Sequence, residues 1–527
     1  MREPADTAVA AGKASMYVSI ENITTLGLGA ILFAVYSRVL TVNELGVLAT
    51  ILLVTTIFQY VGQFGLNLAA ASLIPAAMVD GEEHARRVMW TIVILTVIFG
   101  AIATLAYFLL AETFASLTGD LGQVILFQVA SIFVFADAVA FTCDGLTQGV
   151  RNFLRLSYAG VSGQVVRVVT ALILLFMGYR VLAIVIAGIL GPSGLISIIV
   201  EIPSLVKQLP FAWPRLSDVR HVLRTAIPLN GVSLLTVVST QLDLGIMVLT
   251  TRISQVAVYS VVLTISQMTT SGIILPLNAS LIPHMTKIYK EKGKLIGAFE
   301  EGSRFVSIVS IPIALGLFSI SPLLVRLVSG SKYLTAAIPL SIVMLSLVPY
   351  AFFSLVRACL QARGHNTQIL QAVAVSVGVE GVLALLMAPR IGAAGAAISR
   401  LSLYITMLVV GTILLQRVMG LKVEWKLILR LTIASCAFLL IPILTRFWKD
   451  YSGEAVSIVF ATVLFLVLIK LLKPLRKRDV TVLLQALPGR ISTLLEALRI
   501  DTFAYWLAAG GNDVDDVAMG TQTGVSA

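Results

Sequence analysis

Long apolar segments of about twenty residues follow one another from Ser15 to Lys473, separated by short polar connections. A segment of this length crosses a hydrocarbon core of roughly 30 Å as a helix. Only helices and closed barrels satisfy every backbone polar group inside lipid, and these segments lack the alternation of barrel strands. The pattern predicts an all-α integral membrane protein of about fourteen transmembrane helices, at 16–36, 45–66, 88–110, 122–145, 157–178, 181–203, 226–250, 255–283, 305–328, 335–361, 369–389, 391–415, 428–447 and 455–473.

Composition strengthens this prediction and argues against an enzyme. The chain is 58% hydrophobic and 12% charged, whereas soluble domains have roughly a quarter of charged residues. Its three cysteines lie within apolar segments without ligand-like spacing, and its four histidines are scattered over different polar connections. The sequence contains no phosphate-binding loop, nucleophile elbow or metal motif. We therefore expect a transporter with no catalytic residues, resident metal or cofactor.

The charges report topology. The net charge is +11, but basic residues gather in alternate connections, which the positive-inside rule places in the cytoplasm. Both termini are then cytoplasmic, in a multi-pass protein of the plasma membrane. Residues 1–14 form a cytoplasmic N-terminus, and no removable signal peptide is evident. We expect 476–500 to form an amphipathic cytoplasmic helix and 501–527 a disordered tail.

An internal repeat divides the spans. The tetrapeptide SLIP occurs at 72–75 and at 280–283, Gln148 and Gln361 lie in similar contexts, and Arg38 matches Arg252. The offsets are 208, 213 and 214. They correspond to six spans, and an even number makes the repeats parallel. The predicted domains are an N-lobe at 15–204, a cytoplasmic linker at 205–225, a C-lobe at 226–416 and two appended helices within 417–475.

Several segments resemble the polysaccharide (oligosaccharide) flippase family of the multidrug/oligosaccharidyl-lipid/polysaccharide exporter superfamily. They are SRVLTVNELGVLATILLV (37–54), QFGLNLAAASLIP (63–75), TRISQVAVYSVVLTISQ (251–267), LNASLIPHMTKIYKEKGK (277–294), LVSGSKYLTAAIPLSIVMLS (327–346) and LLMAPRIGAAGAAISRLSLYI (385–405). The resemblance implies two pseudo-symmetric six-helix lobes, as in multidrug and toxin extrusion transporters, around a central cavity. It also implies flipping of a polyprenyl-phosphate- or pyrophosphate-linked glycan, in the bilayer and beside other proteins of envelope polysaccharide assembly.

Such a substrate carries phosphate, so cations within spans are candidate anchors. Arg167 and Arg400 lie near the middle of their spans, and a guanidinium group matches phosphate oxygens or sugar carboxylates. Gln59, Gln63 and Asn67 recur at helical spacing and predict one polar helix face. That face would bind sugars, or hold helices together.

Acidic residues within spans suggest ion coupling. Asp243 and Glu380 lie in the seventh and eleventh spans, with Ser376 one turn before Glu380. In the related lipid II flippases, acidic groups on these two spans are associated with sodium binding, so the resemblance implies a cation site here. Protonation is the alternative, because burial favours a neutral carboxyl group. Na⁺ and H⁺ both remain open as coupling ions.

The repeat also pairs opposite charges. At an offset of 213, Asp144 corresponds to Arg357 and Arg167 to Glu380. We expect these pairs to approach across the lobe interface and to exchange partners as the lobes rock. This gate competes with Arg167 as a substrate anchor and with Glu380 as an ion ligand.

Two other functions stay open. A cation-coupled multidrug or toxin antiporter would share the fold, the repeat and the acidic residues, but a cationic cavity repels cationic drugs. A membrane glycosyltransferase or glycan polymerase would need a sizeable outer loop or a soluble domain, and the predicted outer loops are short.

Overall fold

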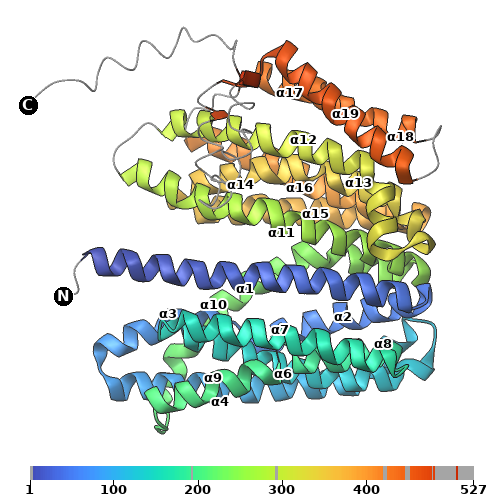
Figure 1. Ribbon diagram of the computed structural model, residues 1–527. Helices are drawn as coiled ribbons and strands as arrows, with labels where there is room; N and C mark the ends of the chain where they lie inside the picture. Colours follow the sequence, from blue (N-terminus) through green and yellow to red (C-terminus); the bar gives the residue numbers. More distant parts are fainter. Residues whose placement is uncertain are drawn as a thin grey trace, which may run out of the picture. The chain divides into compact units, whose positions relative to one another are not determined.

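The computed structural model describes residues 4–191, 194–290, 295–418, 424–445, 451–476, 479–480 and 506–508. These residues form helices joined by short connections, and no strand occurs among them (Figure 1). Thirteen helical segments of the described residues are long and apolar enough to cross a membrane. Each coincides with a predicted span, and the remaining predicted span, 255–283, lies within one continuous helix of 38 residues. The expected all-helical membrane fold is confirmed.

The chain forms two compact units. Unit 1 comprises Met1–Met268, Val325–Ala336 and Glu380–Ser399. Its helices are α1 (Pro4–Val39), α2 (Val42–Gln63), α3 (Leu66–Asp80), α4 (Glu82–Leu109), α5 (Ala111–Ser116), η1 (Leu121–Gln123), α6 (Val124–Gly149), α7 (Phe153–Phe176), α8 (Arg180–Leu190), α9 (Leu195–Gln208), α10 (Leu216–Thr250), the start of α11 (Ile253–Lys290) and η2 (Ser331–Ala336).

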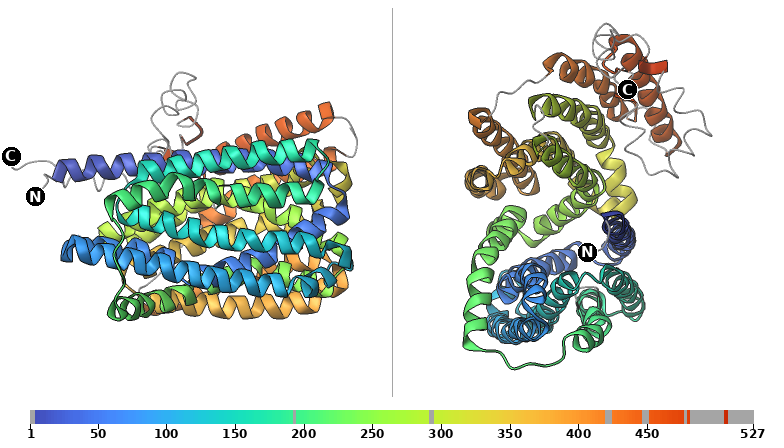
Figure 2. Two further views of the ribbon diagram at one scale, coloured as in Figure 1. Left: turned by 90° about the horizontal axis from the view of Figure 1, so that it is seen from below. Right: turned by 90° about the vertical axis from the view of Figure 1, so that its left-hand side faces the viewer.

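Unit 2 comprises Thr269–Leu324, Ala337–Val379 and Arg400–Ala527. It contains most of α12 (Leu295–Ser329), α13 (Ala337–Leu345), α14 (Leu347–Ala362), the first half of α15 (Asn366–Ile391), most of α16 (Ala393–Val418), α17 (Trp425–Ser435), η3 (Cys436–Leu440), α18 (Ile441–Leu444) and α19 (Tyr451–Leu472). The right-hand view of Figure 2 shows many of the helices of unit 1 nearly end-on. The units cut across the lobes predicted from the repeat, whose boundaries stay a prediction. The predicted helix at 476–500 and the predicted disordered tail fall almost wholly outside the described residues.

The second predicted span is longer than expected and is broken. It runs from Val42 to Asp80, over 39 residues. Thr41 and Glu44 cap its start: the Glu44 amide donates to the Thr41 hydroxyl oxygen over 3.3 Å, and the Thr41 amide donates to the Glu44 carboxylate over 2.8 Å. The helix is interrupted at Phe64 and Gly65, whose φ angles are 47° and 71°. Since left-handed backbone is rare outside glycine, Phe64 marks a strained point inside the span.

Glycines let the helices around this break approach closely. A Cβ on Gly65 would lie 2.5 Å from the Ala226 carbonyl oxygen of α10, and one on Gly149 would lie 2.8 Å from the Ile74 Cβ. A Cβ on Gly145 of α6 would collide with the Asn67 carbonyl oxygen. Because lipid supplies little hydrophobic drive between helices, such small-residue contacts hold a membrane bundle together. α6 is therefore fixed against α3, directly beside the break.

Gly145→Ala tests this packing. We expect the variant to lose about 1–3 kcal/mol of stability, because the added methyl group forces α6 away from α3. Thermal unfolding in detergent, followed by tryptophan fluorescence, measures the loss. Gly231→Ala is the control, since a Cβ there meets nothing within 4 Å, and it should leave stability unchanged or raise it. Equal unfolding temperatures for the two variants would contradict the tight contact.

Candidate functional site

Polar side chains gather where the second span is broken. Gln63, the last residue of α2, is buried, and its Nε2 donates to Asp137 Oδ2 of α6 over 2.9 Å. Gln59 lies half-buried one turn earlier, whereas Asn67 lies half-buried in the first turn of α3, beyond the break. The three residues therefore do not form the continuous helical face that their spacing predicted. They flank an interruption of the helix, where discontinuous spans leave backbone groups available to a ligand.

Arg167 joins this group from α7. It is half-buried and lies within electrostatic range of Asp137 and of the Tyr36 hydroxyl of α1. Its Nε is buried without a hydrogen-bond partner among the described residues. Asp137 offsets part of the cost of a guanidinium group in an apolar span. The structure thus brings together two residues that the sequence proposed for substrate binding, Gln63 and Arg167, through an aspartate that it had not assigned to the site.

α10 adds a further polar group at the break. Asn230 lies beside Gly65, where a Cβ would be 2.6 Å from the Asn230 backbone nitrogen. The Asn230 side-chain oxygen is buried and has no hydrogen-bond partner among the described residues. Asn230 was not predicted from the sequence as a site residue, although a polar side chain in the apolar seventh span is unusual enough to indicate one. We name Gln63, Asn67, Asp137, Arg167 and Asn230 the break site.

Asp243 belongs to a second buried polar group in unit 1. The Tyr259 hydroxyl of α11 donates to the Asp243 carboxylate, and it lies 3.3 Å from the Ala396 carbonyl oxygen of α16. Glu380 is also fully buried. Its neighbour Gly381 faces Leu242, whose Cδ2 would lie 3.2 Å from a Cβ at Gly381, so α15 crosses α10 beside Asp243. The two acidic residues predicted to bind a coupling ion thus lie on helices that meet.

Three other predicted site residues, Ser376, Arg400 and Arg357, lie in unit 2. Ser376 is fully buried, and its hydroxyl donates to the Ala372 carbonyl oxygen over 2.7 Å. Arg400 is buried on α16, and Arg357 is half-buried on α14. Their proposed partners lie in unit 1, and each unit is described by itself. Arg400 as a second anchor, Ser376 as an ion ligand and the pairing of Asp144 with Arg357 therefore stay predictions. Asp144 itself lies in unit 1, where the carboxyl groups of Glu201 on α9 and Glu21 on α1 act on it.

One end of unit 1 is held by contacts between segments far apart in sequence. Lys332 of η2 donates to the carbonyl oxygens of Arg38 and Leu40, and Arg38 donates to the Leu327 carbonyl oxygen. At the start of α2, Glu44 pairs with Arg180 over 2.9 Å. We name this region the Arg38 end. Its contacts join the connection between α1 and α2 to η2. Sequence reasoning did not identify them, because three of the acceptors are backbone carbonyl groups.

Helix starts from both halves of the chain pack at the Arg38 end. A side chain on Gly46 of α2 would collide with the Ile253 carbonyl oxygen at the start of α11. The amide of Ala393, which begins α16, donates to Gln255 Oε1 over 3.2 Å. Gly46 therefore allows two corresponding helices of the repeat to touch at this end.

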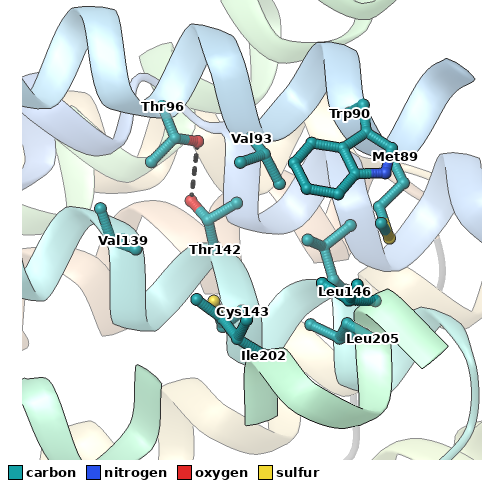
Figure 3. Close-up of a pocket in the computed structure, with 11 residues that line it drawn as sticks. Met89, Trp90, Val93, Thr96, Val139, Thr142, Cys143, Leu146, Ile202 and Leu205 are labelled. Carbon is teal, nitrogen blue, oxygen red and sulfur yellow. Dashed lines mark hydrogen bonds between the residues drawn. The ribbon is translucent and has the colours of Figure 1, made fainter. Parts of the chain in front are cut away.

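An apolar cavity of about 110 Å³ lies between α4, α6 and α9 (Figure 3). Met89, Trp90, Cys143 and Leu146 are among its lining residues. The lining includes only two hydroxyl groups, those of Thr96 and Thr142, and these lie 3.1 Å apart in a mutual hydrogen bond. Because its few polar groups bond one another, this cavity does not suit a glycan or a phosphate.

Comparison with known proteins agrees with the membrane-transporter fold. The profile of the family described as "Polysaccharide biosynthesis protein" matches residues 35–338. The fold is similar to that of the lipid II flippase MurJ in an inward closed conformation, with a TM-score of 0.69 and 14% identity over 87% of this chain and 98% of that one. It is also similar to an inward-facing multidrug resistance MATE family transporter, with a TM-score of 0.61 and 16% identity over 77% and 97% of the two chains.

A third similar structure is a mutant of the Vibrio cholerae MATE transporter VcmN, with a TM-score of 0.55 and 15% identity over 78% of this chain and 98% of that one. No curated protein matches the chain significantly. The similarity to multidrug and toxin extrusion transporters, which the sequence resemblance implied, is confirmed for the fold. At these identities it shows the fold alone.

Tyr259→Phe tests the bond that satisfies Asp243. Removing the hydroxyl leaves a buried carboxylate short of one donor, and we expect a loss of about 1–2 kcal/mol of stability in the thermal unfolding assay. Tyr333→Phe is a matched control: Tyr333 is equally buried, but its hydroxyl has no hydrogen-bond partner among the described residues. If both variants unfold at the same temperature as the unmodified protein, the bond to Asp243 contributes nothing.

Proposed function

The chain belongs to the polysaccharide biosynthesis protein family, and we propose that it is a flippase that moves a polyprenyl-linked oligosaccharide across the cytoplasmic membrane by alternating access. The match of the family profile to residues 35–338 is the observation that carries this proposal. Its fold relatives are transporters and a flippase, which agrees with a protein that moves a substrate without changing it chemically.

The break site supplies chemistry that suits the head group of such a lipid. The substrate carries a phosphate or pyrophosphate, and Arg167 offers a charged donor whose Nε is not spent on another described residue. Amide groups at Gln63, Asn67 and Asn230 can donate to and accept from sugar hydroxyls. Asp137 neutralises part of the positive charge of Arg167. The phosphate is therefore bound weakly enough to be released. Arg400 is proposed as a second anchor, from its burial on α16.

The Arg38 end supports alternating access. By the positive-inside prediction, this end faces the outside, and both termini face the cytoplasm. Lys332 and Arg38 bond to backbone carbonyl groups, and such contacts can form and break without leaving a charge buried in lipid. We propose that they open each time the substrate leaves and close again when the carrier returns.

Asp243 and Glu380 are the proposed coupling pair. Both are fully buried, on helices that cross beside them. Binding of Na⁺ or H⁺ to this pair would change the charge at the α10–α15 contact. The electrochemical gradient would thereby bias the direction of flipping.

A multidrug antiporter is the second candidate, because two solved MATE transporters share the fold. Family membership and the guanidinium group at the break site favour the flippase. A cationic drug would be repelled by Arg167, whereas a phosphate would be attracted.

Flipping in proteoliposomes tests the proposal. Purified protein is reconstituted with a labelled polyprenyl-pyrophosphate oligosaccharide, and a glycan-cleaving enzyme added outside reports how much has crossed. We expect flipping to fall about tenfold or more in Arg167→Ala, because a charge-assisted bond to phosphate is lost. Arg167→Lys should retain part of the activity, since it keeps the charge without the planar fork.

Arg155→Ala, at the start of the same helix α7, is the control and should flip at the normal rate. If unmodified protein does not flip the lipid in the presence of a sodium or proton gradient, the proposed function is wrong. Equal rates for Arg167→Ala and the control would remove Arg167 as the anchor and leave the rest of the proposal standing.

Lys332→Ala tests the Arg38 end. Losing the contacts to Arg38 and Leu40 should shift the protein toward the state open at this end. Ser37 is fully buried beside these contacts. We therefore introduce Ser37→Cys in a cysteine-free background and measure its reaction with a membrane-impermeant maleimide. The reaction should be several-fold faster with Lys332→Ala than without it, and unchanged with Lys470→Ala in unit 2. An unchanged rate in both would show that Lys332 does not hold this end closed.

A further inference from the structure

Three carboxyl side chains that belong neither to the break site nor to the Asp243 group converge in unit 1. Glu201 of α9 is fully buried, and its carboxyl group lies against that of Asp144 on α6. Glu21 of α1 lies within electrostatic range of both. We name Glu21, Asp144 and Glu201 the carboxyl cluster. A signal for Glu201 was present in the sequence and was overlooked: it is a lone charge in the apolar segment IIVEIPSL (198–205).

The surrounding helices make room for the cluster. Gly160 of α7 lies opposite Glu21, and any side chain there would collide with the Glu21 carboxyl group. The Ser157 hydroxyl, one turn earlier on α7, donates to Glu21 Oε2 over 3.3 Å. α7 thus presents a glycine and a donor to the carboxyl group of α1.

Glu201 is the unsatisfied member. Both of its carboxyl oxygens are buried and accept no well-formed hydrogen bond from the described residues. The Thr147 hydroxyl lies next to Glu201, but it too is buried without a partner in hydrogen-bond geometry. A buried polar group without a partner is costly, so these oxygens call for a donor beyond those of the described residues.

A proton satisfies this arrangement. Two carboxylate groups carry only acceptors, so their contact becomes a hydrogen bond only when one of them holds a proton. The described charged and titratable groups acting on the pair are Glu21 from α1 and the thiol of Cys143, next to Asp144; no described basic side chain is among them. No group of three His, Cys, Asp or Glu side chains placed to hold a metal ion occurs among the described residues.

We propose that Asp144 and Glu201 together bind one exchangeable proton, and that losing it loosens α1 from α7. Without the proton, two adjacent negative charges face Glu21 and repel α1. α1 packs mainly on α7, with a smaller contact to α8 (Figure 1). Only 11% of its apolar stretch is buried, so the described packing of α1 is sparse. A role of this site in coupling transport to a proton gradient rests on the proposed flippase function. The binding of the proton itself does not.

Carbodiimide labelling tests the proton directly. Dicyclohexylcarbodiimide reacts with protonated carboxyl groups in apolar surroundings, and peptide mass spectrometry locates the adduct. In the intact protein we expect labelling of Asp144 or Glu201 at mildly acidic pH, a fall of about tenfold at alkaline pH, and no protection by sodium. The exposed Glu83, paired with Arg87 over 2.6 Å, should not be labelled. Absence of the adduct at every pH, or protection by sodium at constant pH, would overturn the proposal.

Hydrogen exchange tests the effect on α1. After correction for the intrinsic rate, amide exchange in the first half of α1 should rise with pH by about tenfold in the unmodified protein. Glu201→Gln should make exchange independent of pH and slow, because the amide donates to Asp144 permanently. Asp144→Asn serves the same purpose if the first variant does not fold, and Glu83→Gln should behave as the unmodified protein.

A pH-dependent exchange that persists in both cluster variants would show that the cluster does not control α1. Neither readout needs transport. Labelling without flipping would contradict the proposed function and would leave the proton site supported. Flipping without labelling would contradict the proton site and would leave the proposed function supported.

Discussion

The absence of water inside a bilayer is the constraint on which this structure depends. A polar group in a span must find its partner within the protein, because lipid offers none. At the break between α2 and α3, the Gln63 amide donates to Asp137, and Asp137 in turn lies within electrostatic range of Arg167. The chain can keep a guanidinium group within its spans only because these residues come from three helices that meet at one place.

The same constraint explains where the helices pack most closely. Gly65 and Gly145 bring α10 and α6 within backbone distance of the broken span. At the Arg38 end, lysine and arginine side chains bond to the ends of helices, where carbonyl groups lack partners of their own. The polar contacts of the break site and of the Arg38 end thus lie at a helix break and at helix ends, which are points at which a transporter can rearrange.

The spans could be predicted from the sequence because hydrophobic length alone decides them. The interruption at Phe64 and Gly65 could not, since it depends on α10 and α6 filling the space beside it. The anchors Gln63 and Arg167 were found as polar groups in apolar segments, but their link through Asp137 required the tertiary structure. Glu201 was missed because it lies near the end of its predicted span, where a charge looks like an ordinary boundary. The expected contact between Asp144 and Arg357 stays a prediction, and two carboxyl groups, those of Glu21 and Glu201, act on Asp144 in the structure.

Native mass spectrometry of the purified protein tests the central claim most directly, that the break site binds the phosphate of a lipid-linked glycan. The account predicts an adduct with a polyprenyl-pyrophosphate oligosaccharide, its loss in Arg167→Ala, and no competition from a cationic drug. An adduct with the cationic drug, displaced by protons or sodium and indifferent to Arg167, would contradict the account and assign the protein to drug export.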